Sequence, residues 1–200
     1  MMDKVAYTQT PRQKEISDAA LELISRKGIQ GLTIKNLSKM IGISEPAIYR
    51  HYDNKIDILL AILQLFRENT EKHFAWSKNV EMGAMEKIAG IFQRHFASFA
   101  ATPSLVSVIF SEELFRGEPR LITQISEIIE KNYSILTGIV RDGQENGEVR
   151  QDIEAGHLTM MILGALRLLV KKWQFSGYSF DLEAEGQKLQ QSIQSIMLKV

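Results

Sequence analysis

A short run of side chains between positions 49 and 55 has the chemistry of a nucleic-acid contact. Tyr49, Arg50, His51 and Tyr52 are long polar or aromatic residues in direct succession, and Lys55 follows after a gap of two residues. Cationic and hydroxyl-bearing side chains hold phosphate oxygens, and arginine can also read the edges of bases. Such side chains need a rigid element that presents them to a duplex, and the residues around them predict that element.

The residues from 33 to 42 predict a short helix followed by a sharp turn. Thr33 is a favourable N-cap, and Ile34, Leu37 and Ile41 recur at helical spacing, so that one face of the helix is apolar. Gly42 follows the last apolar position. Glycine adopts a positive φ at little cost, which allows the chain to turn sharply at the end of a helix.

A second helix is expected to leave this turn at a fixed angle. Ser44 is a favourable N-cap for it, and Ile43 and Ile48 stand at the two positions of a hydrophobic staple. Asn54 would cap a further helix that begins at Lys55, where the ammonium group and the free N–H groups of the helix start can hold a phosphate. Two helices joined in this way form a helix-turn-helix, whose second helix lies in the major groove.

An amphipathic helix precedes this segment and is expected to cover it. Thr10 and Gln13 form a capping box around Pro11 at the first helical position, and Gly28 ends the helix. Its apolar stripe consists of Ile16, Ala19, Ala20, Leu23 and Ile24. Arg12 and Lys14, near its start, either touch backbone phosphate or belong to a solvated helix end.

The order of residues 33–55, T-I-x-x-L-S-x-x-I-G-I-S-x-x-A-I-Y-R-H-Y-x-N-K, resembles the DNA-binding domain of the TetR/AcrR family of transcriptional repressors. The resemblance covers roughly the first quarter of the chain. Ile56 stands where family members often carry an acidic residue, and Tyr52 replaces a common phenylalanine. The resemblance implies a homodimeric repressor that holds a palindromic operator in double-stranded DNA and leaves it when a small, largely apolar effector binds.

The docking geometry of such a motif divides the expected DNA contacts into two groups. We expect phosphate contacts from Thr33, Tyr49, His51, Tyr52 and Lys55. We expect contacts to base edges or their rim from Lys35, Ser44, Glu45, Pro46, Ala47 and Arg50.

Composition agrees with a globular protein of the cytoplasm. The 200 residues are 44% hydrophobic, and the chain has no cysteine, which excludes disulfides and thiolate metal sites. We find no signal pattern and no apolar run long enough for a membrane span. The net charge is zero, but residues 1–55 hold nine Lys or Arg and six Asp or Glu, so a modestly positive head is attached to a modestly negative body.

The remainder of the chain shows helical periodicity and no strand-like alternation, so the fold is predicted to be all-α with about nine helices. Further helices are expected over residues 55–77, 82–101, 104–115, 120–146, 153–175 and 181–200. We expect a helix-turn-helix domain at residues 1–54 and a helical effector-binding and dimerisation domain at residues 55–200.

The body is expected to enclose an apolar cavity with a few polar groups that orient a ligand. Candidate aromatic residues are Phe66, Phe92, Phe96, Phe99, Phe110, Tyr133 and Trp173, most of which also have a packing role. Candidate polar residues are His95, Glu112, Asn132, Tyr133 and Arg167.

The last two helices are too apolar for ordinary surface helices. They predict half of a four-helix bundle that a second copy of the chain completes, although the same residues could fill the core of a monomer. The expected dimer residues are Met160, Gly164, Leu168, Leu189, Ile193 and Ile196.

Catalysis has little support in the sequence. We find no nucleophile elbow, phosphate-cradling glycine loop, dinucleotide fingerprint or H-E-x-x-H pair, and the four histidines lack metal-ligand spacing. We therefore expect no enzyme, no cofactor and no metal. One alternative keeps DNA binding but replaces the small effector with a protein partner, because residues 101–136 faintly resemble that region in the nucleoid-occlusion branch of the family.

Overall fold

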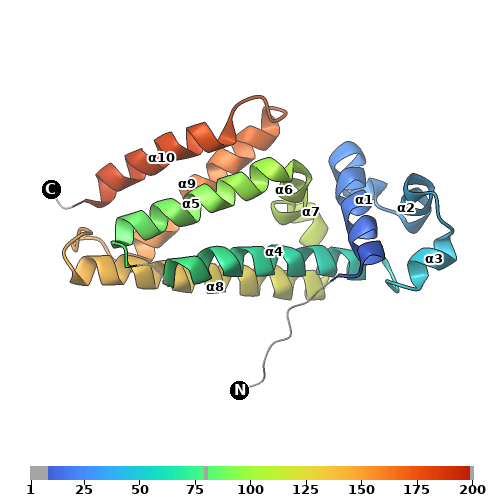
Figure 1. Cartoon of the computed structure of the whole chain (residues 1–200), viewed down its shortest axis with the longest axis horizontal. Coiled ribbons are helices and arrows are strands. Elements are labelled where there is room, and N and C mark those ends of the chain that lie inside the picture. The colour runs from blue at the N-terminus through green and yellow to red at the C-terminus, as the bar shows by residue number, and fades with distance from the viewer. Residues whose placement is uncertain (1–8, 79–80, 199–200) are drawn as a thin grey trace, which may run out of the picture. The chain divides into compact units, whose positions relative to one another are not determined.

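The computed structural model describes residues 9–78 and 81–198, and within these ranges it contains helices and no β-strand (Figure 1). This confirms the all-α prediction. Among the described helices, none is long and apolar enough to cross a membrane. The elements in chain order are α1 (Pro11–Lys27), η1 (Ile29–Gly31), α2 (Ile34–Ile41), α3 (Glu45–Tyr49), α4 (Lys55–Lys78), α5 (Ala84–Ala101), α6 (Pro103–Ile109), α7 (Glu112–Phe115), α8 (Pro119–Glu145), α9 (Ala155–Phe175) and α10 (Leu182–Met197).

The chain divides into two compact units. Unit 1 comprises the described residues up to Asn69 together with Ser104–Ser126, and unit 2 comprises Thr70–Pro103 together with the residues from Glu127 onward. The boundaries fall inside α4 and α8, so each of these helices contributes one part to each unit.

The amino-terminal part of unit 1 folds around the apolar stripe of α1. Thr10 and Gln13 form the expected capping box, in which the Gln13 N–H donates to Thr10 Oγ1 at 3.2 Å. The buried stripe of α1 packs on α2, whose Leu37 is fully buried, and on the short η1 turn. Three short elements thereby share one core that none of them could form alone.

The remaining part of unit 1 combines the first half of α4 with α6, α7 and the start of α8. Ile58, Ile62 and Leu63 of α4 are buried, as are Val106 of α6 and Leu121 of α8. The first half of α4 is therefore covered on more than one side.

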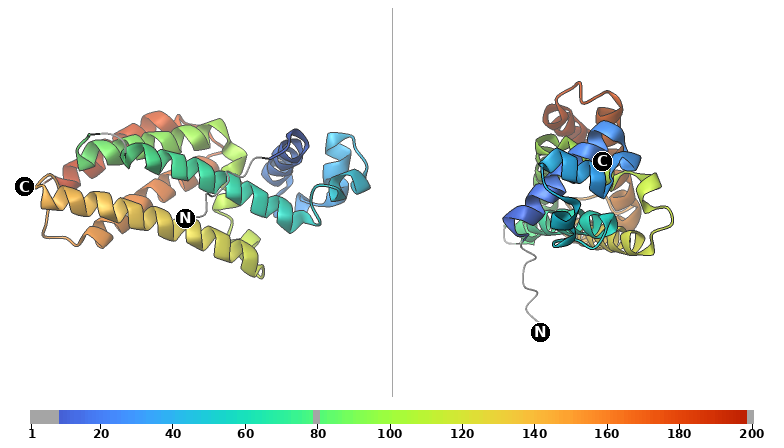
Figure 2. Two further views of the ribbon diagram at one scale, coloured as in Figure 1. Left: turned by 60° about the horizontal axis from the view of Figure 1, so that its bottom comes forward. Right: turned by 90° about the vertical axis from the view of Figure 1, so that its right-hand side faces the viewer.

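Unit 2 is built around the long helix α5. α5 and α10 lie side by side (Figures 1 and 2), and Gly186 of α10 allows their close approach, since a Cβ there would lie 2.3 Å from Cδ2 of Phe96. The buried face of α5 includes Ile88, Phe92 and Phe99.

One predicted helix is divided in the structure. We expected a single helix over residues 104–115, but α6 ends at Ile109 and α7 begins at Glu112. Ser111 has an extended backbone and its Oγ accepts a hydrogen bond from the Leu114 N–H at 3.2 Å, so it caps a new helix. Pro103 occupies the first turn of α6, where its missing N–H costs nothing. The described residues therefore contain ten α-helices instead of about nine.

Candidate functional site

The turn between α2 and α3 has the conformation that its sequence predicts. Thr33 Oγ1 accepts from the Asn36 N–H at 3.0 Å and caps α2. Gly42 has φ 77°, and the N–H groups of Gly42 and Ile43 both donate to the Ser38 carbonyl oxygen, at 2.9 and 3.1 Å. These bonds close α2 and fix the point from which α3 departs.

The short helix α3 is anchored by one apolar residue and exposes its other side chains. Ile48 is fully buried, whereas Tyr49 is 49% exposed and Arg50 is exposed at the end of the helix. Ser44 occupies the N-cap position, but its hydroxyl makes no capping hydrogen bond. The polar groups of α3 therefore face away from the core.

Most of the predicted DNA-contact residues share this exposure. His51 and Ala47 are half-buried. The exposed members are Thr33, Lys35, Ser44, Glu45, Pro46, Tyr49, Arg50 and Lys55.

Tyr52 differs from the other predicted contact residues. It is only 6% exposed, and its hydroxyl accepts a hydrogen bond from Gln9 Nε2 at 3.2 Å and lies 3.4 Å from Ser17 Oγ. This position ties the segment after α3 to α1, and it does not support the phosphate contact that we predicted for Tyr52.

The start of α4 also departs from the prediction in one respect. Asn54 caps the helix as expected, with Oδ1 accepting from the N–H groups of Ile56 and Asp57 at 2.8 and 3.2 Å. Two of the groups that we expected to face a phosphate are thus already bonded. The exposed Lys55 side chain is the cationic group at this helix start.

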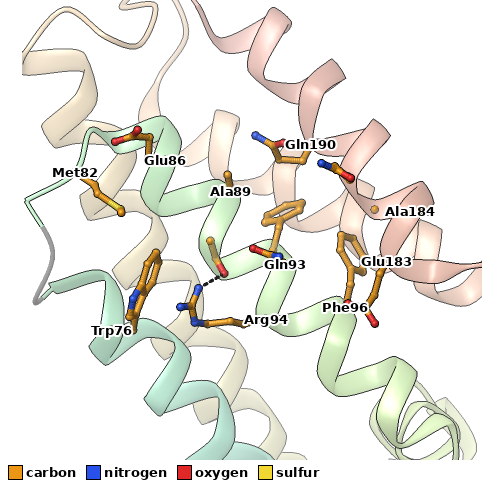
Figure 3. A pocket seen from close by; sticks show the side chains of 14 residues that line it. Trp76, Met82, Glu86, Ala89, Gln93, Arg94, Phe96, Glu183, Ala184 and Gln190 are labelled. Carbon is orange, nitrogen blue, oxygen red and sulfur yellow. Dashed lines mark hydrogen bonds between the residues drawn. The ribbon is translucent and has the colours of Figure 1, made fainter.

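Unit 2 contains a cavity of about 720 Å³ between the end of α4, α5 and α10 (Figure 3). This volume falls in the range of about 300–1,000 Å³ that is typical of small-molecule sites. The lining combines aromatic, aliphatic and polar side chains. The lining residues are Trp76, Met82, Glu86, Ala89, Gly90, Phe92, Gln93, Arg94, Phe96, Glu183, Ala184, Gly186, Gln187 and Gln190.

A stacked pair of side chains stands at one end of this cavity. The Arg94 guanidinium lies 3.6 Å from the centroid of the Trp76 ring, and Arg94 Nη1 donates to the Gly90 carbonyl oxygen at 3.0 Å. An arginine over an indole face is an attractive cation–π arrangement. The pair combines a fixed charge with a flat apolar surface.

Two histidines lie close together between α4 and α5. The ring centroids of His73 and His95 are 4.9 Å apart, and His95 also makes an edge contact with Phe74 at 5.8 Å. His95 Nδ1 lies 3.0 Å from the Ile91 carbonyl oxygen, so this nitrogen carries the proton and donates it. His73 Nδ1 is buried without a hydrogen-bond partner.

Burial keeps both imidazoles neutral. Desolvation by burial is the largest cause that lowers the pKa of His73 to about 4, and electrostatic interactions with His95 and Arg94 contribute in the same direction. Burial also lowers the pKa of His95, against the hydrogen bond to Ile91, which raises it. Within the described residues, no cluster of three or more potential metal ligands accompanies this pair.

The predicted ligand residues are only partly brought together. Phe92 and Phe96 line the cavity. Trp173 is buried, and its Nε1 donates to the Phe180 carbonyl oxygen at 2.9 Å, so it packs inside unit 2. Arg167 is exposed on α9, and the side chain of Glu112 lies outside the described part of the structure. The lining does not include Phe66, His95, Phe99, Phe110, Asn132 or Tyr133.

Sequence reasoning did not identify the cavity residues Trp76 and Arg94. Trp76 lies near the end of a long helix and Arg94 among the polar positions of α5, so their sequence separation gives no sign that the side chains stack. An amphipathic pattern assigns residues to a face, but it does not show which faces enclose a cavity.

Three of the six expected dimer residues lie on an exposed apolar face of α9. Met160 is 63% and Leu168 is 62% exposed, and Gly164 between them is exposed as well. Ile196 of α10 is also exposed. Ile193, in contrast, is only 7% exposed, so its burial within one chain does not support a contact with a second copy.

Two family models together cover almost the whole chain. Residues 16–62 match the model for bacterial regulatory proteins of the tetR family, and residues 63–198 match the model for the C-terminal region of YsiA-like proteins. The chain belongs to the TetR family. It is a TetR-family DNA-binding transcriptional regulator, as the resemblance of residues 33–55 implied.

Similar TetR-family proteins include regulators of fatty acid metabolism. The fatty acid metabolism regulator protein of Bacillus subtilis (strain 168) is 28% identical over 178 residues, which cover 87% of this chain and 89% of that protein. The nucleoid occlusion factor SlmA of Vibrio cholerae is 24% identical over 165 residues, with 80% of this chain and 84% of that protein covered.

Solved structures of TetR-family regulators share the fold. FadR from Bacillus subtilis, in complex with stearoyl-CoA, matches with a TM-score of 0.75 and 26% identity over 91% of this chain and 97% of that chain. The ketosteroid regulator KstR2 of Mycobacterium tuberculosis matches with a TM-score of 0.84 at 18% identity over 98% of this chain and 100% of that chain, which reflects the shared fold.

Proposed function

We propose that this TetR-family regulator is a repressor that binds a palindromic operator as a homodimer and is released from it by a long-chain acyl compound. The similarity to the Bacillus subtilis fatty acid metabolism regulator supports the acyl effector, as does the likeness to FadR solved with stearoyl-CoA. We assign DNA binding to residues 1–54 and effector binding with dimerisation to residues 55–200.

The DNA-binding part of the proposal rests on the segment from α3 to the start of α4, which has buried residues on one side and exposed polar residues on the other. Ile48 and Tyr52 are buried as anchors, while Tyr49, Arg50 and Lys55 remain exposed. Buried anchors of this kind hold the backbone in one conformation. Binding of the exposed groups to a DNA duplex therefore costs less conformational entropy than it would from a flexible loop. We therefore assign phosphate contacts to Thr33, Tyr49, His51 and Lys55, and leave Tyr52 out.

Contacts to bases would come from the start of α3. Ser44, Glu45 and Pro46 are exposed and Ala47 is half-buried, and Lys35 and Arg50 are exposed on either side of them. In a helix-turn-helix, the first residues of the second helix reach the base edges. We propose that these residues determine which operator sequence is preferred. The phosphate contacts would fix the position of the protein along the duplex.

The exposed apolar face of α9 supports the homodimer. Met160, Gly164 and Leu168 follow one another at helical spacing on this face, and a contiguous apolar surface of this kind marks an interaction site. A twofold dimer places two reading helices in successive major grooves, so the two half-sites should lie one helical turn apart, roughly 34 Å, or a multiple of it.

Release follows from thermodynamic linkage. If the acyl effector favours a body conformation in which the two reading helices are wrongly spaced, DNA must oppose effector binding by the same factor. α4 and α8 run through both compact units, so they form a continuous covalent and hydrogen-bonded path for such a change.

The test combines operator selection with effector titration. The full-length protein is used to select duplexes from a random DNA pool, and we expect enrichment of a palindrome. Dodecanoyl-CoA is then titrated into the complex with the selected duplex, and we expect the DNA affinity to fall. Absence of an enriched sequence would contradict the DNA-binding part, and equal effector affinity for free and DNA-bound protein would contradict release.

A second candidate function replaces the acyl effector with a protein partner. Its support is the similarity to the nucleoid occlusion factor SlmA of Vibrio cholerae, which extends over 165 residues. The same experiment distinguishes the two candidates. Enrichment of a palindrome, with a DNA affinity that dodecanoyl-CoA does not change, favours a DNA-bound protein whose body binds another protein.

A further inference from the structure

We propose that Arg94 and Trp76 form a head-group site in the cavity of unit 2, which binds the ionised group of the acyl effector, a carboxylate or a phosphate. The inference rests on the proposed function, because it concerns which acyl compounds the regulator accepts. It assigns the choice between ionised and neutral acyl compounds to one arginine.

Arg94 has hydrogen-bonding capacity that the protein itself does not use. A guanidinium has five N–H donors, and one of its nitrogens, Nη1, donates to the Gly90 carbonyl oxygen. Among the described residues, no carboxylate forms an ion pair with Arg94. The planar fork of a guanidinium matches carboxylate and phosphate geometry, so the remaining N–H groups suit an anionic ligand group.

Trp76 holds this guanidinium in place. The guanidinium carbon lies 3.6 Å from the centroid of the Trp76 ring. Gly90, which is on α5 like Arg94, lies close to the same ring. A Cβ at Gly90 would lie 2.3 Å from Cη2 of Trp76, so the indole can pack here only because residue 90 has no side chain. The stack and the Gly90 hydrogen bond restrict Arg94 before a ligand arrives, which lowers the entropy cost of binding.

The two carboxylates of the cavity lining lie away from the stacked pair. Figure 3 shows Arg94 beside Trp76, with Glu86 near the start of α5 and Glu183 on the α10 side. Glu86 Oε2 also accepts a hydrogen bond from the Gly83 N–H at 3.3 Å, as part of the cap of α5. The Arg94 end is therefore the part of the cavity that suits an anion.

The lining of the cavity also includes apolar side chains. Phe92 and Phe96 are one turn apart on α5, with ring centroids 5.8 Å apart in an edge contact. Met82, which is exposed, lines the same cavity. A cavity lined by both a fixed cation and apolar side chains suits an amphipathic molecule, with its acyl chain on the apolar residues and its ionised group at Arg94.

The experiment compares four probes in isothermal titration calorimetry with the full-length protein. The probes are dodecanoyl-CoA, dodecanoate, the neutral dodecanol and CoA without an acyl chain. In Arg94→Gln, we expect the affinity for the ionised acyl probes to fall by ~10- to 100-fold, because a hydrogen bond to a charged group is lost. Binding of dodecanol should not change, and Arg94→Lys should restore part of the lost affinity.

Arg141→Gln is the matched control. Arg141 is an exposed arginine of α8 in the same unit and does not line the cavity, so this variant should bind all four probes like the wild type. Equal loss of ionised and neutral probes in Arg94→Gln would show a purely structural role for Arg94 and overturn the proposal. An unchanged affinity for every probe would overturn it as well.

The two sources of the anionic group give different patterns. Loss confined to dodecanoate assigns Arg94 to a carboxylate, and loss confined to dodecanoyl-CoA and CoA assigns it to a phosphate. The intrinsic fluorescence of Trp76 gives an independent readout, and a ligand-induced change present in the wild type should be absent in Trp76→Phe.

If the wild type binds no acyl probe, the proposed effector class fails. If it binds them and leaves DNA but Arg94→Gln behaves like the wild type, only the head-group site fails.

Discussion

Arg120, in the first turn of α8, donates a hydrogen bond from Nη1 to Oδ1 of Asp57, in the first turn of α4, at 3.0 Å. One turn later, Gln124 Nε2 donates to the Leu60 carbonyl oxygen at 3.2 Å. Both contacts lie within unit 1. They hold the start of α8 against the helix that follows directly on the proposed DNA contacts.

We expect Arg120→Gln to weaken operator binding by about two- to tenfold, because single contacts in a coupled network change the coupling only modestly. Its melting temperature should hardly change, since exposed ion pairs contribute little to stability. Fluorescence anisotropy with the selected operator measures the effect. Arg116→Gln, which changes an exposed neighbouring arginine, is the control. Equal operator affinity of the two variants would show that the Arg120 contact does not position the head.

Lys55→Ala should weaken binding to every DNA sequence and reduce the salt slope of log K by about 1, as expected for the loss of one phosphate contact. Ser44→Ala should instead change which operator is preferred, since Ser44 stands at the start of the reading helix. Affinities measured at several salt concentrations separate the two effects. Lys72→Ala, an exposed lysine on the unit 2 part of α4, should leave the slope unchanged. A slope unaltered by Lys55→Ala would remove Lys55 from the contact set.

Gly42→Ala should destabilise the DNA-binding head by about 1–2 kcal/mol, because a side chain at φ 77° costs that amount in the left-handed region. Chemical denaturation followed by circular dichroism measures the change. Gly138→Ala is the control, for which we expect the free energy of unfolding to change in the opposite direction. Gly138 lies inside α8 with open space where a Cβ would stand, so alanine should stabilise the protein by about 0.5–1 kcal/mol. Destabilisation of equal size in both variants would contradict the role of the turn.

Leu168→Glu should shift the protein toward the monomer at micromolar concentration, because it places a charge at the centre of the proposed dimer face. Sedimentation equilibrium measures the dissociation constant, which we expect to rise at least ~10-fold. Ile129→Glu is the control, since Ile129 is an exposed apolar residue of α8 outside this face. A dimer that resists Leu168→Glu as well as Ile129→Glu would place the interface elsewhere.

The half-buried His73 predicts that the protein becomes less stable in acid. Its pKa is about 4 in the folded protein, below the ordinary value of 6.5, so between these values the unfolded chain binds a proton that the folded chain does not. The free energy of unfolding therefore falls as the pH drops from about 6.5 towards 4 and then levels off for this group. Denaturation at pH 7 and pH 4.5 measures the fall, which should be smaller in His73→Gln. An equal fall in both proteins would assign the acid sensitivity to other groups.

Local sequence determined the DNA-binding head. Thr33, Gly42 and Asn54 each act within a few residues of their own position, as caps or as a positive-φ turn, so their roles follow from residue type and spacing. The periodic apolar residues of α1 likewise predicted which face of this helix is buried. The division of residues 104–115 into two helices escaped the pattern, because Ser111 is compatible with both a helix interior and a cap.

Only the tertiary structure decided which residues that are far apart in the sequence make contact. Tyr52 reads as a DNA contact in the sequence, but its hydroxyl lies beside Ser17 in the core of the head. The stacking of Arg94 on Trp76 at the end of a cavity joins residues of two helices, and nothing in the sequence pairs them. Periodicity specifies the face of a helix on which a side chain lies. The crossing of helices far apart in sequence specifies what that face meets, and this depends on packing across the whole unit.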